Sequence, residues 1–141
     1  MTDGMLLPEV LRRECRSYLQ YIRESYPWAK GKDEHLRAKV LSLAESEYQA
    51  LSDLARALQK RHITLPYLGA FSPSFTSSNF LAVSYVVPRL AGAQRQAIAE
   101  LERDLKHIQN AELRALFEVY CDLKRANLQE FENLAGAAKA A

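Results

Sequence analysis

The sequence predicts an all-α domain, arranged as an antiparallel four-helix bundle with one long crossover between the second and third helices. Apolar residues recur every three or four positions through long stretches, and most of the Gly and Pro residues fall between those stretches. Ala, Leu, Glu, Gln and Arg, which favour helices, are abundant. With 141 residues we expect one domain, in which residues 8–134 form the bundle between an N-terminal tail (1–7) and an Ala-rich tail (135–141).

The first two helices are predicted over residues 8–26 and 33–62. The first begins at Pro8, a residue suited to a first helical turn, and Pro27 ends it. Asp33 is the expected N-cap of the second helix. Because only residues 28–32 connect the two helices, we expect them to be antiparallel neighbours.

Residues 63–79 lack helical periodicity and are rich in turn-forming residues. Such a long connection suits a crossover along the length of a bundle, held by the aromatic residues Tyr67, Phe71 and Phe75. A lid over a substrate pocket is the alternative, since long loops often carry function.

The third and fourth helices are separated by a break at Gln109 and Asn110. We expect the third to begin near Ser78 or Asn79, with Phe80 on its apolar seam and a kink near Pro88. The apolar stripe of the fourth runs from residue 113 to residue 134.

Five polar residues lie where core residues are expected. Glu47 falls within the apolar stripe of the second helix, and Glu14 lies at the edge of the stripe of the first. Gln94 interrupts the third helix, and Lys124 and Asn127 interrupt the fourth. A charge in a core costs several kcal/mol unless a partner or a metal ion compensates it, so these side chains are expected to meet.

This arrangement resembles the ferritin-like superfamily. The resemblance covers residues 8–134 and rests on topology and on the polar core positions. In that superfamily two helices each supply a Glu and two each supply Glu-x-x-His. Here the two single positions read Glu14 and Gln94, and the two motifs begin at Glu47 and Lys124 and contain no His. The resemblance implies a degenerate di-metal site.

We therefore expect no metal cofactor. The ammonium of Lys124 would lie where relatives hold metal ions, bonded to Glu47 and Glu14, while Gln94 and Asn127 complete the hydrogen bonds. In the alternative reading Glu14 and Glu47 still bind iron or manganese, with help from Gln94 and Glu102. In the simplest reading Glu47 lies at the edge of the stripe, Lys124 reaches solvent, and no site exists.

Composition excludes several other functions. The net charge is +2 with interspersed signs, so we expect no nucleic-acid partner. No stretch suits a membrane span or a signal peptide, and no Gly-rich phosphate loop or Cys-x-x-Cys motif occurs. Cys15 and Cys121 fall within predicted helices, which indicates thiols of a cytoplasmic protein.

The predicted function is non-catalytic protein interaction or self-association, with a homodimer as the expected form of the latter. The crossover and the Tyr-rich first helix would supply the contact surface. The alternatives are a metal-binding oxidoreductase or iron-handling protein with a non-standard site, and a small-molecule binder with a pocket beside Gln94 and Asn127.

Overall fold

The computed structural model describes residues 1–140, and side chains through residue 137. It contains five α-helices and one short 3-10 helix, listed in chain order: α1 (Asp3–Cys15), α2 (Tyr18–Ser25), α3 (Asp33–Lys60), η1 (Pro73–Ser78), α4 (Val83–Leu105) and α5 (Ala111–Ala140). Within residues 1–140, β-structure is limited to one isolated bridge between Trp28 and Ala82. The predicted all-helical class is confirmed.

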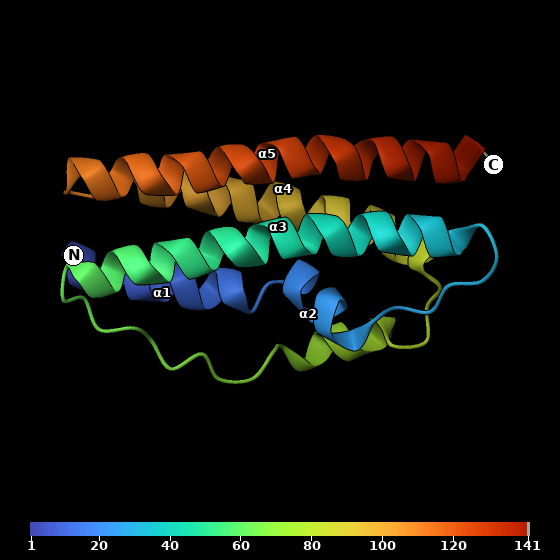
Figure 1. The fold of residues 1–141 in the computed structure, drawn as a ribbon, viewed down its shortest axis with the longest axis horizontal. Coiled ribbons are helices and arrows are strands. Elements are labelled where there is room, and N and C mark those ends of the chain that lie inside the picture. The colour runs from blue at the N-terminus through green and yellow to red at the C-terminus, as the bar shows by residue number, and fades with distance from the viewer. Residues whose placement is uncertain (141) are drawn as a thin grey trace.

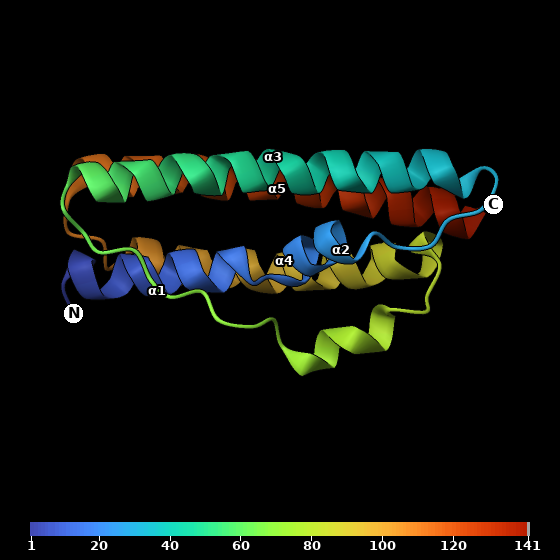
Figure 2. The ribbon, with the colours of Figure 1, turned by 60° about the horizontal axis from the view of Figure 1, so that its bottom comes forward.

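The long helices lie along one another in two layers (Figures 1 and 2). Figure 2 shows α3 in front of α5 in one layer, and α1, α2 and α4 in the other. The helix α3 runs opposite to α1 and α2, whereas α4 runs in the same direction as α3 and α5 returns. Residues 61–82 connect α3 to α4 along the length of the molecule (Figure 1).

Two clusters of buried apolar side chains fill the space between the layers. One lies around Leu7, Leu58 and Phe117, and the other around Ile22, Val87 and Phe131. The polar residues Glu14, Glu47, Gln94, Lys124 and Asn127 are buried as well. No helix of the described chain is both long and apolar enough to cross a membrane.

The predicted first helix is wrong in two respects. It begins at Asp3 rather than Pro8, because Leu6 and Leu7 are buried in the core and the Asp3 carboxylate accepts hydrogen bonds from the backbone of Gln109 and Asn110. Residues 3–7 are therefore not a tail. The helix is also interrupted after Cys15, and the hydroxyl of Ser17 caps the N-terminus of α2 by accepting from the backbone N–H of Gln20 at 3.2 Å.

Other helix boundaries differ from the prediction as well. The helix α4 begins at Val83 and not near Ser78, because the backbone N–H of Val83 donates to the carbonyl of Trp28 at 2.8 Å. This leaves Phe80 outside the helix and 96% exposed. The helix α5 continues to Ala140, which the high helix propensity of Ala explains, so the predicted tail from residue 135 is helical through residue 140.

Candidate functional site

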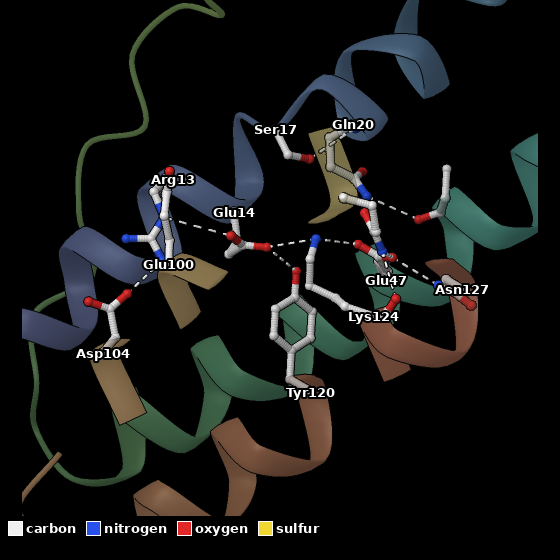
Figure 3. A network of polar contacts seen from close by, with 12 residues as sticks. Arg13, Glu14, Ser17, Gln20, Glu47, Glu100, Asp104, Tyr120, Lys124 and Asn127 are labelled. Atoms are coloured by element: carbon white, nitrogen blue, oxygen red, sulfur yellow. Dashed lines mark hydrogen bonds and ion pairs between the residues drawn. The ribbon is translucent and has the colours of Figure 1, made fainter. Parts of the chain in front are cut away.

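The polar residues of the core come from four helices and meet around Lys124 (Figure 3). Glu14 lies in the last turn of α1, Glu47 near the middle of α3 and Gln94 near the middle of α4. Lys124 and Asn127 are three residues apart on α5, so they share one face of that helix. Each therefore occupies a core position of its own helix.

Lys124 is the centre of this cluster. Its ammonium lies 2.8 Å from Oε1 of Glu14 and 2.9 Å from Oε1 of Glu47. The Lys124 side chain is 0% exposed, and each carboxylate is 1% exposed. Charge-assisted hydrogen bonds of this length between buried groups compensate much of the cost of burying the three charges.

The second oxygen of Glu47 is held by two amides. Oε2 of Glu47 accepts from Nε2 of Gln94 at 2.6 Å and from Nδ2 of Asn127 at 2.9 Å. The same Gln94 nitrogen donates to the backbone carbonyl of Lys124, and the same Asn127 nitrogen donates to Oγ of Ser46. Because an ionised carboxylate only accepts, these bonds fix which end of each amide faces Glu47.

Glu14 is held less completely. Its Oε1 accepts from Lys124 and, at 2.8 Å, from the hydroxyl of Tyr120. Its Oε2 has no hydrogen-bond partner among the described residues and lies 3.7 Å from Nε of Arg13. Nη2 of Arg13 donates to Asp104 at 2.7 Å, whereas its Nε lies 2.9 Å from Oε2 of Glu100 and makes no hydrogen bond among the described residues.

Two pKa values in the cluster are raised. Burial alone would lower the pKa of Lys124, but the charges of Glu14 and Glu47 and their hydrogen bonds raise it well above its usual value. Burial, followed by the charge of Glu14, raises the pKa of Tyr120 well above its usual value. Lys124 is therefore an ammonium and Tyr120 a neutral hydrogen-bond donor at neutral pH.

The structure brings all five predicted core residues together, and Lys124 contacts both carboxylates. The simplest reading, in which Lys124 reaches solvent, is wrong because its side chain is fully buried. Glu102 lies elsewhere: it is exposed and pairs with Arg125 at 3.2 Å. Sequence reasoning missed Tyr120 and Arg13, since a Tyr in an apolar stripe and an Arg at a helix surface are ordinary residues there.

The three residues predicted for a contact loop behave differently from one another. Tyr67 is 91% exposed. Phe71 and Phe75 are half-buried and pack on the rings of Tyr18 and Tyr21, with centroid distances of 5.3 to 5.6 Å. Phe71 and Phe75 thus attach the crossover to α2, whereas the Tyr67 side chain makes no such contact with the Tyr18 and Tyr21 rings.

The ionisable groups of the site are engaged by one another. The carboxylates are bonded to an ammonium, and within residues 1–137 no group of three or more His, Cys, Asp or Glu side chains is placed to hold a metal ion. Both thiols are free, and burial raises the pKa of Cys15 and of Cys121. Their thiolate forms are therefore disfavoured at neutral pH.

Comparison with protein-family models, with curated proteins and with solved structures yields no match.

Proposed function

We propose that this protein is a non-catalytic, metal-free bundle of the ferritin-like type that acts through self-association. The observation that carries the proposal is the buried ammonium of Lys124 between Glu14 and Glu47. The element order, the directions of the helices and the long connection over residues 61–82 support the ferritin-like assignment. It rests on this topology and on the polar core positions alone.

The ammonium supports a metal-free core for two reasons. It uses one oxygen of each carboxylate, and amides occupy the other oxygen of Glu47. It also places a positive charge at the centre of the cluster, where a divalent cation would be repelled. Two carboxylates without imidazole are in addition a poor ligand set for two metal ions.

A groove between α3 and α5 supports self-association. Its volume is about 810 Å³, and its apolar lining comes from Ala50, Leu54, Ala57, Leu116, Val119 and Leu123. Leu116 and Val119 are exposed, Val119 at 67%. A contiguous apolar surface bordered by charges is typical of protein interfaces.

The charges at the rim of the groove favour a second copy of the chain as the occupant. Arg56 pairs with Asp53 on α3, and Arg61 at the C-terminus of α3 pairs with Glu112 on α5. The rim therefore presents both signs, as a twofold interface requires, because each patch must complement itself. On twofold pairing these arginines can exchange carboxylates between the two copies, while the alanines on α3 permit close approach of the helices.

Mass measurement by light scattering after size-exclusion chromatography, at about 100 μM protein, tests self-association. The wild-type chain is expected to have the mass of a dimer, and Val119→Glu the mass of a monomer because it places a charge in the apolar centre of the interface. Tyr85→Glu, which changes an exposed aromatic residue on α4, is the matched control and should remain dimeric. A wild-type monomer, or a dimeric Val119→Glu, would contradict the proposed interface.

A further inference from the structure

A second cavity reaches the polar core where α1 and α2 meet α4. Its volume is about 260 Å³, and Glu14, Gln94 and Lys124 lie in its wall. Ser17 and Tyr18, at the interruption between α1 and α2, form part of its border. The cavity shares no lining residue with the groove between α3 and α5, so a molecule bound here would leave the proposed dimer interface free.

Two acceptors in this wall have no donor. Oε2 of Glu14 is buried and has no hydrogen-bond partner among the residues that the structure describes. Gln94 is 2% exposed, and its Nε2 donates to Glu47 and to the carbonyl of Lys124. The other end of this amide, Oε1, accepts no hydrogen bond within residues 1–137. Buried acceptors without donors are costly, so both oxygens favour a bound group that brings N–H or O–H.

Two donors belong to the same wall. Nε of Arg13 lies 3.7 Å from Oε2 of Glu14 and 2.9 Å from Oε2 of Glu100, and it makes no hydrogen bond among the described residues. The ammonium of Lys124 contacts Glu14 and Glu47, which leaves one of its three N–H groups without an acceptor in the described part of the chain. Figure 3 shows Glu14 between Arg13 and Lys124. The wall therefore offers donors as well as acceptors.

The charges around the cavity favour a neutral ligand. Three cations and two carboxylates line it: Arg13, Arg16, Lys124, Glu14 and Glu100. Two further carboxylates contact these cations, Glu47 at Lys124 and Asp104 at Arg13. Neither sign is in clear excess, so a charged ligand would lose its hydration without a free counter-charge to pair with.

The remaining wall is apolar and the volume is small. Leu19, Phe75, Leu90, Ala93 and Ala97 line it. Pockets for drug-sized ligands usually span roughly 300 to 1,000 Å³. A cavity of about 260 Å³ therefore suits a ligand of only a few carbon atoms.

We propose that this cavity binds a small aliphatic primary carboxamide. Such a group has two N–H donors and a carbonyl oxygen that accepts two hydrogen bonds. The N–H groups donate to Oε2 of Glu14 and Oε1 of Gln94, and the carbonyl oxygen accepts from Lys124 and from Nε of Arg13. An alcohol has a single O–H, so it satisfies only one of the two acceptors. The alkyl chain packs on the apolar wall.

Titration of the ¹⁵N-labelled full chain with butanamide up to about 50 mM, followed by NMR at pH 7, tests the site. We expect saturable shifts in the backbone amides around Glu14, Ser17 and Ala97. In 2-pentanone a methyl group replaces the NH₂ of butanamide, so the ketone should bind at least about tenfold more weakly because it cannot donate to the two acceptors. Absence of saturable binding of butanamide would overturn the proposal and leave water molecules as the partners of these groups. Equal binding of the ketone, or tighter binding of n-butylammonium, would also overturn it.

Two alanine substitutions on α4 locate the binding. Ala97→Leu fills the cavity without altering a charge and should abolish the saturable shifts, whereas Ala99→Leu, at an exposed position of the same helix, should retain them. Binding that persists in Ala97→Leu would place the amide elsewhere and contradict the proposed site. Circular dichroism of both variants establishes that each is folded.

Discussion

The side chain of Lys124 compensates two buried carboxylates at once. With the ammonium removed, Glu14 and Glu47 would remain buried with their charges only partly balanced by amides, a phenol and the more distant Arg13. Breaking a buried ion pair in this way typically costs about 3–5 kcal/mol. We expect Lys124→Met to lower the free energy of unfolding by that amount at pH 7, as measured by urea denaturation.

The matched control is Lys106→Met, which removes an exposed ammonium just beyond the C-terminus of α4. Its effect should stay within about 0.5 kcal/mol, as for most surface substitutions. A Lys124→Met protein as stable as this control would show that the ammonium does not neutralise Glu14 and Glu47.

The raised pKa values of Tyr120 and Lys124 make the stability of the fold depend on pH in the alkaline range. The pKa of Tyr120 and the pKa of Lys124 are both raised in the folded state, while in the unfolded state both groups lose their protons near pH 10. Above about pH 10 the unfolded state therefore binds fewer protons than the folded state, so the free energy of unfolding decreases as pH rises. Below that pH both groups are protonated in the folded and in the unfolded state, so they add no pH dependence to the free energy of unfolding.

Tyr120→Phe separates the contribution of the phenol. We expect it to lower stability by about 2 kcal/mol at pH 7, because Glu14 loses a charge-assisted hydrogen bond. Between pH 10 and 11 the decrease in stability should be smaller than in the wild type, by up to about 1.4 kcal/mol per pH unit, since one titrating group is gone. Urea denaturation at several pH values measures both effects, and an unchanged slope would contradict the raised pKa of Tyr120.

At the residue scale, the sequence predicts the members of the network that break an apolar pattern. Glu47, Gln94, Lys124 and Asn127 stand out because a polar residue in a core stripe requires a partner. Tyr120 does not stand out, since its ring satisfies the apolar pattern and only the structure shows where its hydroxyl points. Periodicity predicts which face of a helix is buried, but it does not predict which groups the end of a long side chain contacts.

At the scale of elements, the interruption between α1 and α2 depends on Ser17. Its hydroxyl accepts from the backbone N–H of Gln20 at the start of α2. Ser17→Ala should lower the free energy of unfolding by about 1 kcal/mol, the usual value for loss of an N-cap. Ser52→Ala is the control, because that hydroxyl bonds only within its own helix, to the carbonyl of Tyr48, and its loss should change stability by less than about 0.5 kcal/mol. Thermal or urea denaturation measures both, and equal effects would contradict the capping role.

The interruption escaped prediction because apolar spacing continues across it. Leu11, Cys15, Tyr18 and Ile22 keep helical intervals, and neither Gly nor Pro marks the break. A signal was present in the order Ser17, Tyr18, Leu19, Gln20, since Ser followed three residues later by Gln is typical of a helix start. The side chain of Gln20 instead donates to the carbonyl of Ala44 on α3, so the signal is fulfilled only in part.

At the scale of the whole molecule, the lengths of the connections predict the directions of the helices more accurately than they predict the residues at which the helices begin and end. The short connections between α2 and α3 and between α4 and α5 each reverse the direction of the chain, whereas the long connection leaves α4 running in the same direction as α3, as Figure 1 shows. The dimer interface proposed at the groove between α3 and α5 could not be predicted in this way. The exposure of Leu116 and Val119 beside Leu54 depends on how two helices distant in sequence pack, which no local pattern encodes.

The central claim is that an ammonium, rather than metal ions, compensates the carboxylates of the core. Elemental analysis of the purified protein tests it most directly, both as isolated and after incubation with Fe(II) and Mn(II) followed by desalting. We predict far less than one equivalent of either metal per chain, with the stability unchanged by the incubation. Near-stoichiometric iron or manganese would contradict the account, because Glu14 and Glu47 would then bind metal and Lys124 would have to leave its place between them.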